Sequence, residues 1–459
     1  MAREDYGYAA DIPYLRDFKP MLAPAWLDHV ALVAGIEPPA RRNGFAWCDL
    51  GCGQGVTAAI LAATHPSGVF HGIDAMPAHI DHARRLVSAA AIPNLELHAV
   101  DFAAASGLEL PHFDYIVAHG VYTWIGPEAQ CAVRRFIDRR LKPGGLVYLS
   151  YNAMPGWARD LPFQGLLREF GRTFPGDNIG RLAAAAQLGR TLADAGVASL
   201  TASFIVKELQ ERPEDYQPAY LVHEFMPPAW RPLYVTEVRR DMATIGLEPV
   251  GSATLSENLD WMVLDEAARR GIEAITERDA RELVRDYYLD QRFRCDVFAR
   301  GNRPLGLDER AGRLHSSTFV LARPAPAIRY TTTTPAGPFA YDSPAARAII
   351  AGLASGQPVS AGDLRTLLTL CAAADIMPAE PGRASVSDLN RALYGRVDGP
   401  EEIRWLALPC GTAVEVDLNL MRSLRDGEEI DEDGFPGWRG FLASHGIQNF
   451  PQRRGEHIG

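Results

Sequence analysis

Phe45-Ala-Trp-Cys-Asp-Leu-Gly-Cys-Gly-Gln-Gly-Val-Thr57 is the stretch that decides the fold of this 459-residue chain. Its apolar beginning, residues 45–50, predicts a strand, and a helix is expected to begin near Val56. Three glycines lie in the turn between them, where a backbone without Cβ atoms bends tightly and lets a ligand approach. The stretch therefore predicts a strand–turn–helix unit with a ligand at the carboxyl end of the strand.

Two acids accompany this turn. Asp49 stands two residues before the first glycine, and Asp74 ends the next expected strand, residues 69–73. A carboxylate at the tip of the second strand accepts hydrogen bonds from both hydroxyls of a ribose. A carboxylate at Asp49 repels a pyrophosphate but attracts a cationic amino group. Together with a glycine spacing that departs from GxGxxG, the acids favour S-adenosylmethionine over NAD.

The following segments continue the same pattern. Leu95 to Val100 and Phe113 to Ala118 predict two further strands, and Leu146 to Tyr151 predicts another. After the first of these, Asp101 is placed to accept from an adenine amino group, and the ring of Phe102 is placed to flank the base. Strands that alternate with helices predict an α/β fold, with a doubly wound, mostly parallel Rossmann-like sheet that binds ligands at the carboxyl ends of its strands.

Four motifs follow this strand order: Asp49-Leu-Gly-Cys-Gly-Gln-Gly55, Gly72-Ile-Asp74, Val100-Asp-Phe102 and Leu141-Lys-Pro-Gly-Gly-Leu-Val147. In these motifs the chain resembles the class I S-adenosylmethionine-dependent methyltransferases. Three more motifs resemble bacterial members that carry a methyltransferase regulatory domain, a group that includes protein lysine methyltransferases acting on outer-membrane proteins. These motifs are His119-Gly-Val-Tyr-Thr-Trp124, Ser150-Tyr-Asn-Ala-Met-Pro-Gly-Trp157 and Tyr220-Leu-Val-His-Glu-Phe-Met226. The resemblance implies S-adenosyl-L-methionine as cofactor and S-adenosyl-L-homocysteine as product.

The expected cofactor site combines the glycine turn, the acids at the strand ends and the loops that follow them. We expect its residues to be Asp49, Gly51, Cys52, Gly53, Gln54, Gly55, Asp74, Ala75, Met76, Asp101, Phe102 and His119. The six cysteines are scattered, without a CxxC pair or a Cys/His metal spacing. They predict reduced thiols and no metal site.

Methyl transfer is an in-line displacement, so the protein must align the acceptor with the methyl group and see that the acceptor has lost its proton. For a lysine amine with a pKa of about 10.4, deprotonation at pH 7 requires roughly 4.6 kcal/mol. The catalytic candidates are Tyr122, Tyr151, His223 and Glu224, and the substrate-binding candidates are Trp124, Asn152 and Trp157. The aromatic faces favour a bound cation by about 0.5–2 kcal/mol each. The structural alternatives are packing for any one aromatic residue, and a capping or interdomain hydrogen bond for the His-Glu pair.

The sequence suggests three regions. Residues 1–157 form a cofactor-binding core with an N-terminal cap, residues 158–325 a helical insertion or regulatory region plus the last strands of the sheet, and residues 326–459 a mainly helical interaction domain. Arg292 to Phe298 and Thr318 to Leu321 are expected to complete the sheet, and Trp230 to Ile245 to form a helix. The proline- and threonine-rich stretch 323–338 reads as a linker or an edge strand.

Composition limits the classes of partner that this chain is expected to bind. A net charge of −11 and a pI near 5.6 argue against a nucleic-acid backbone. The sequence shows neither a signal peptide nor a membrane span, so we expect a cytoplasmic enzyme with no membrane partner. The C-terminal domain is interpreted as a small interaction or dimerisation domain, which would allow a homodimer.

Three functions stay open. The favoured one is N-methylation of protein lysine side chains. The first alternative is O- or N-methylation of a small molecule such as a natural product, and the second is a regulatory protein that binds the cofactor without catalysis. The intact acids at the strand ends count against the last one.

Overall fold

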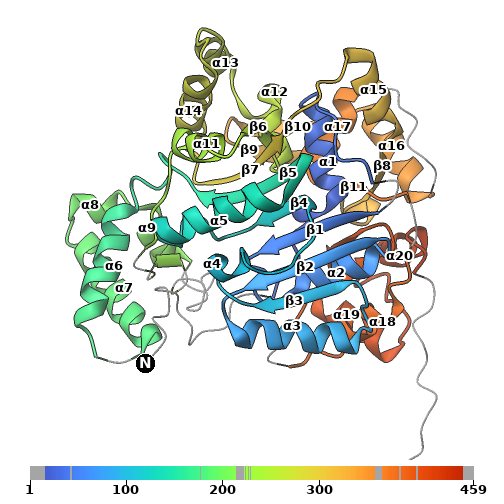
Figure 1. The fold of residues 1–459 in the computed structure, drawn as a ribbon, viewed down its shortest axis with the longest axis horizontal. Coiled ribbons are helices and arrows are strands. Elements are labelled where there is room, and N and C mark those ends of the chain that lie inside the picture. The colour runs from blue at the N-terminus through green and yellow to red at the C-terminus, as the bar shows by residue number, and fades with distance from the viewer. Residues whose placement is uncertain are drawn as a thin grey trace, which may run out of the picture.

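The computed structural model describes residues 16–447, apart from 42–43, 176, 213–221, 223, 226, 228, 357–363, 382–383 and 400–401. Its central sheet consists of β1 (Phe45–Leu50), β2 (Gly68–Asp74), β3 (Leu95–Ala99), β4 (Phe113–Ala118), β5 (Leu141–Asn152), β6 (Leu247–Ser252) and β7 (Phe293–Arg300). The strand order is β3-β2-β1-β4-β5-β7-β6, and only β7 runs antiparallel to its neighbours (Figure 1). The predicted doubly wound, mostly parallel sheet is therefore confirmed.

The central strands are apolar on both faces because helices cover both sides of the sheet. Every residue of β1 and β4 is buried, as expected for inner strands of a parallel sheet. Along β1, Trp47 packs into the core on one face and Cys48 into the core on the other. The alternation places the strand tips, and not their sides, within reach of a ligand.

Two helical layers enclose the sheet. One face carries η1 (Pro20–Leu22), α1 (Pro24–Val33), α2 (Val56–Thr64) and α3 (Pro77–Ala89). The other face carries α4 (Phe102–Ala105), α5 (Pro127–Arg140), α11 (Val235–Ala243) and, packed on α11, α14 (Arg278–Leu289). Short elements η3 (Leu255–Asn258), α12 (Asp260–Val263) and α13 (Glu266–Glu273) connect β6 to α14.

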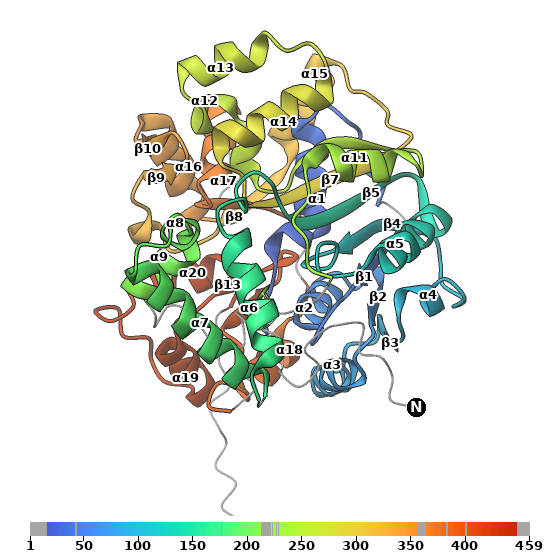
Figure 2. The same cartoon turned by 90° about the vertical axis from the view of Figure 1, so that its left-hand side faces the viewer.

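A helical insertion follows β5, as the sequence predicts. It contains α6 (Leu161–Thr173), α7 (Asn178–Asp194), α8 (Ala198–Thr201) and α9 (Phe204–Glu211). These helices have an apolar cluster of their own that includes Trp157, Phe163, Phe225 and Trp230. The insertion extends beyond one side of the sheet in Figure 1 and faces the viewer in Figure 2.

The C-terminal part adds helices and short antiparallel strand pairs. The helices are α15 (Leu307–Ser316), η4 (Ala325–Ala327), α16 (Pro344–Ala354), α17 (Leu364–Ala372), α18 (Ser387–Tyr394), α19 (Leu418–Asp426) and α20 (Trp438–Ser444). The strand pairs are β9 (Thr331–Thr334) with β10 (Gly337–Ala340), β8 (Thr318–Leu321) with β11 (Ile376–Ala379), and β12 (Trp405–Leu408) with β13 (Thr412–Glu415). The threonine run is thus a strand, the second of the two sequence interpretations.

Two sequence predictions are wrong. Thr318–Leu321 does not complete the main sheet, because it pairs with Ile376–Ala379, some sixty residues away in the chain. The helix expected from Trp230 begins only at Val235. The preceding segment is extended, since the backbone N–H of Leu233 donates to the carbonyl of Asn152 at 2.9 Å and Pro232 has no N–H to continue a helix.

One hydrophobic core joins the C-terminal part to the sheet. Trp47 of β1, Leu61 of α2, Leu406 of β12 and Leu420 of α19 belong to the same buried cluster. Side chains reinforce the junction, because Glu380 lies against both Arg41 and His65. The C-terminal part therefore packs directly on the helices that support the glycine turn.

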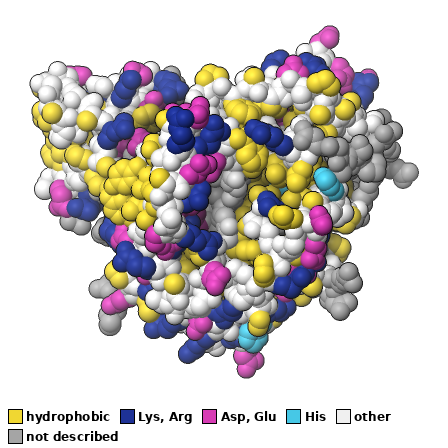
Figure 3. Space-filling model, turned by 90° about the horizontal axis from the view of Figure 1, so that it is seen from above, with side chains coloured by type: hydrophobic (Ala, Val, Ile, Leu, Met, Phe, Trp, Pro, Cys, Tyr) yellow, Lys and Arg dark blue, Asp and Glu magenta, His cyan; other side chains and the backbone are white. Residues whose placement is uncertain are grey.

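The upper face of the molecule carries both signs of charge (Figure 3). Seen from above, basic and acidic side chains are interspersed (Figure 3). None of the helices in the described part of the chain combines the length and apolar content needed to cross a lipid bilayer.

The shared core predicts that substitutions in the C-terminal part lower the stability of the whole fold. Leu406 is 0% exposed, so we expect Leu406→Ala to lower the free energy of unfolding by about 2–5 kcal/mol. Leu307 is 81% exposed, and Leu307→Ala is the matched control with a change near zero. Denaturant unfolding of both variants measures the difference. Equal effects of the two substitutions would contradict a core that runs through the C-terminal part.

Candidate functional site

Different structural constraints explain why glycine occupies each of the three positions in the turn after β1. Gly51 and Gly55 have φ values of +85° and +73°, and a Cβ added to either would lie 2.5 Å from a neighbouring side chain, Val121 or Ala83. Gly53 also has a positive φ, +53°, but no atom lies within 4 Å of its added Cβ. Gly51 and Gly55 are thus required for packing, whereas the space beside Gly53 is open to a ligand.

Asp74 fixes the shape of this turn from the tip of β2. Its carboxylate accepts from the backbone N–H of Gly53 and of Met76, each at 2.9 Å. The Nδ1 atom of His79 lies 3.3 Å from the same carboxylate. Each carboxylate oxygen has two lone pairs, so these bonds leave acceptor capacity for ligand hydroxyls.

Asp49 is the unusual group of the site. Its side chain is buried with 4% exposure, and its Oδ1 atom has no hydrogen-bond partner. Burial, together with the nearby carboxylate of Asp74, raises the pKa of Asp49 to about 8. A buried acceptor without a donor is unfavourable by about 1–3 kcal/mol, so this position is prepared for a cationic donor from a ligand.

The third strand brings an acid and an aromatic ring to the same edge. Asp101 caps α4 by accepting from the backbone N–H of Ala104 at 2.7 Å. Phe102 lies beside the glycine turn, with its Cζ atom 4.0 Å from the position of a Cβ on Gly51. The two residues are therefore next to the turn, as the strand order predicts.

His119, at the tip of β4, is held by its neighbours. Its Nδ1 atom lies 2.8 Å from the hydroxyl of Tyr148, and its ring stacks on that tyrosine with centroids 5.9 Å apart. Phe293 contacts the imidazole edge-on at 5.9 Å. Burial lowers the pKa of His119 to about 3, with a smaller contribution from Lys19. His119 is thus neutral at pH 7 and suits packing or hydrogen bonding to a cofactor better than proton transfer.

The structure does not bring Tyr122 and Tyr151 to the site. The hydroxyl of Tyr122 donates to Asp241 of α11 at 2.8 Å, and that of Tyr151 donates to Asp296 of β7 at 2.6 Å. Both side chains belong to the core on the α5 and α11 face of the sheet. Burial and the adjacent carboxylates raise the pKa of each phenol, which opposes a role as a base.

Two of the residues expected to contact the methyl acceptor, Asn152 and Glu224, meet at the end of β5. Asn152 donates from Nδ2 to Oε1 of Glu224 at 2.5 Å, and both residues are buried. Burial raises the pKa of Glu224 to about 7, although Asn152 and the charge of Arg292 oppose that shift. Glu224 is therefore divided between its acid and base forms at neutral pH.

An aromatic cluster lies next to Glu224 and includes the neighbouring residue Phe225. The ring of Trp157 is 4% exposed and meets Trp230 edge-on at 5.0 Å. The guanidinium of Arg292 lies 4.4 Å from the Trp157 ring centroid. Trp124 is half-buried and packs against the same cluster. Arg292 and Trp230 were not among the sequence candidates, because no local motif links them to residues 152 and 157.

The remaining candidates differ in exposure and surroundings. Gln54 is a buried residue of the turn itself, whereas Ala75 and Met76 are accessible beside Asp74. Cys52 is a free thiol whose pKa is raised by burial. His223 lies outside the described residues.

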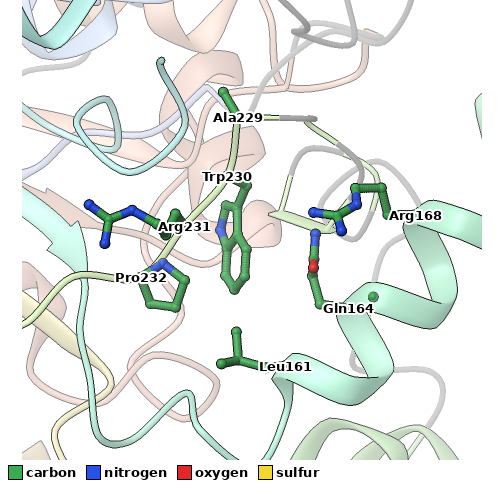
Figure 4. A pocket seen from close by; sticks show the side chains of 8 residues that line it. Leu161, Gln164, Arg168, Ala229, Trp230, Arg231 and Pro232 are labelled. Atoms are coloured by element: carbon green, nitrogen blue, oxygen red, sulfur yellow. The ribbon is translucent and has the colours of Figure 1, made fainter. Parts of the chain in front are cut away.

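A hollow of about 450 Å³ opens next to the acceptor side. In Figure 4, Trp230 stands between Arg231 and Pro232 on one side and Gln164 and Arg168 of α6 on the other. The backbone N–H of Arg231 donates to the carbonyl of Thr123 at 3.0 Å, so the hollow borders the loop after β4.

Two family models match the chain. "Methyltransferase domain" covers residues 48–147, and "Predicted methyltransferase regulatory domain" covers residues 217–300. An uncharacterised protein of Synechocystis is 31% identical over 359 residues, which span 78% of this chain and 71% of that protein. Trans-aconitate 2-methyltransferase of Methylobacterium radiotolerans is 33% identical over 155 residues, or 34% of this chain and 55% of that protein.

Solved structures show the same fold. PKMT2 from Rickettsia typhi, in complex with AdoHcy, aligns with a TM-score of 0.68 at 19% identity. The alignment covers 90% of this chain and 88% of that chain. The match therefore extends over the insertion and the C-terminal part as well as the sheet.

The placement of Tyr151 predicts a structural role. Tyr151→Phe removes a hydrogen bond to a buried carboxylate, so we expect the free energy of unfolding to fall by about 1.5–3 kcal/mol. The affinity for S-adenosylmethionine should change less than about twofold, a difference of less than roughly 0.4 kcal/mol. Tyr288 is 49% exposed, and Tyr288→Phe is the matched control. If the Tyr151→Phe variant had normal stability but failed to transfer methyl groups, the Tyr151 hydroxyl would have a catalytic role.

Proposed function

The chain belongs to the class I S-adenosylmethionine-dependent methyltransferases that carry a regulatory domain, and we propose that it N-methylates lysine side chains of proteins. The observation that carries the proposal is the buried Asn152–Glu224 pair, beside two tryptophans at the end of β5. The structural similarity to PKMT2, a protein lysine methyltransferase, supports the same class of acceptor.

S-adenosylmethionine supplies a methyl group on a positively charged sulfur. The residues present fit this group, because Asp49 offers an unpaired buried carboxylate oxygen and Gly53 leaves space beside the backbone. We assign Asp49 to the cationic amino group and Asp74 to the ribose hydroxyls. Asp101 and Phe102 are assigned to the adenine.

Glu224 is assigned to the lysine amine. An ionised carboxylate accepts a hydrogen bond from the incoming ammonium, and a pKa of about 7 lets the same group take up the proton near neutral pH. Asn152 fixes the carboxylate by donating to Oε1. Burial among Trp157 and Trp230 lowers the local dielectric, which favours the uncharged amine.

The shape near this site favours a polypeptide over a small molecule. Arg168 and Arg231 on the rim of the hollow have side-chain exposures of 32% and 61%, so the hollow opens to solvent. A flexible chain is able to lie along such a surface while one side chain enters.

We also propose a cytoplasmic location, because all six cysteines, each within the described part of the chain, are free thiols. A homodimer stays a proposal.

Substitution of Asp49 separates cofactor binding from folding. Asp49→Asn removes a charge-assisted contact, so we expect the affinity for S-adenosylmethionine to fall roughly 10–100-fold, measured by calorimetry. The fold should keep or gain stability, because an uncharged amide replaces a buried acid. Asp81 is an exposed acid on α3, and Asp81→Asn is the matched control.

The same residue gives a pH dependence. The folded, ligand-free pKa of about 8 lies above the ordinary 3.8, so the acid form of Asp49 is favoured in the fold. Its contribution to stability therefore decreases as pH rises from 3.8 to about 8. Binding of a cation requires the ionised form, so wild-type affinity rises with pH through about 8 and Asp49→Asn lacks this rise. Equal pH profiles for the two proteins would contradict the assignment.

Incubation of the purified chain with lysate and methyl-labelled cofactor tests the proposed acceptor. We expect label in protein bands, and at lysine after hydrolysis. Label only in the low-molecular-mass fraction would instead indicate a small-molecule acceptor. Release of no S-adenosylhomocysteine, in spite of cofactor binding, would reject catalysis.

Glu224→Gln tests the assigned base in the same assay. We expect methyl transfer to fall about 10²–10⁴-fold while cofactor affinity is retained. Wild-type activity should rise as pH passes about 7, and the variant should lack that step. Glu211 of α9 is 57% exposed, and Glu211→Gln is the matched control. Unchanged transfer by Glu224→Gln would remove this residue from the mechanism.

A further inference from the structure

A second group of chemically reactive side chains lies on β2 and β3, apart from the cofactor and acceptor residues. His71 projects from β2, and Glu96 and His98 project from β3. The register pairs His71 with Glu96, and Ile73 with His98, so the three side chains lie on the same face of the sheet. Strand β3 is the edge of the sheet, where one strand pairing holds it (Figure 1).

The ligand atoms of the three residues point at one another. Nδ1 of His71 lies 3.2 Å from Nε2 of His98. Carboxylate oxygens of Glu96 lie 3.7 Å from the first nitrogen and 3.8 Å from the second. A tetrahedral ion with bonds of about 2.0–2.2 Å separates its ligand atoms by roughly 3.3–3.6 Å. The two Glu96 distances belong to different oxygens, and one Glu96 oxygen and the two nitrogens all lie within 4.8 Å of one another. Shifts of up to about an ångström would therefore bring the three atoms to the spacing of zinc ligands.

The chemical states of the side chains suit a metal. Neutral imidazole presents a lone pair on one ring nitrogen, and this is the form in which histidine binds a metal. Without an ion, one ring must turn an N–H toward the other ring's nitrogen. Glu96 is 68% exposed, which gives an ion access from solvent and leaves a fourth position for water.

We propose that His71, Glu96 and His98 form a three-ligand site for a divalent metal ion of the zinc class. Two imidazoles and one carboxylate are a ligand set that zinc takes in proteins. The sequence gives no metal spacing, because the ligands come from two strands and lie about 25 residues apart in the chain. The proposal is independent of the methyl acceptor and concerns a site that the reaction does not use.

The position of the site predicts that a bound ion would link strands β2 and β3. His71 lies three residues before Asp74, and His98 lies three residues before Asp101. An ion held by both histidines would fix the edge strand to β2 at the level from which both acids project. We therefore expect bound metal to stabilise the fold.

Zinc titration of the chelator-treated full chain tests the proposal. We expect one equivalent of zinc per chain by elemental analysis after dialysis. A melting temperature higher by about 2–5 °C is expected at a zinc concentration near 100 times the dissociation constant. His98→Ala should weaken zinc binding roughly 100-fold, if the ligands share the binding free energy equally. His112 is an exposed histidine before β4, and His112→Ala is the matched control that keeps the zinc.

A second variant separates the metal from the hydrogen bond. His98→Gln keeps a polar partner for His71 but is a poor zinc ligand, so it should fold, bind S-adenosylmethionine and lose the zinc-dependent rise in melting temperature. Wild-type chain that binds no zinc would overturn the proposal. Retention of one equivalent by His98→Gln and His98→Ala would overturn it as well, because the ion would then lie on other residues.

Discussion

The burial of the Asp49 carboxylate is the constraint on which the site depends. Strand β1 lies between β2 and β4 and is buried along its length, so its tip has little access to water. An acid there has no donor for Oδ1 and a pKa raised to about 8. In the site that we propose, a positively charged ligand would relieve this unfavourable group, so free energy spent in folding would be recovered as binding selectivity.

Asp74 has a different task at the neighbouring tip. Its two backbone hydrogen bonds fix the glycine turn before any ligand arrives. The turn therefore approaches the ligand in a prepared shape, which reduces the ordering required on binding. Asp74 fixes the shape of the turn, and Asp49 is the group that we assign to the cationic ligand. The proximity of the two carboxylates is one reason why the pKa of Asp49 is raised in the ligand-free fold.

Local patterns were sufficient for most strands of the sheet and for the acids at the strand tips. Apolar runs that end in glycines or acids place Asp49, Asp74 and Asp101 at strand tips without knowledge of distant contacts. They were insufficient for Tyr151, whose hydroxyl partner Asp296 is 145 residues away in the chain. Strand alternation places Tyr151 on the opposite face from Asn152. The partner on β7 could not be inferred from the local sequence.

The acceptor side depends on such distant contacts throughout. Glu224 lies in the stretch that matches the regulatory-domain model, whereas Asn152 ends a strand of the methyltransferase sheet. The backbone of residues 231–233 joins the two, because it bonds to Thr123 and to Asn152 beyond the strand tips. A displacement of this segment would therefore move the proposed base and the rim of the hollow together. These hydrogen bonds connect the stretch that matches the regulatory-domain model to the methyltransferase sheet.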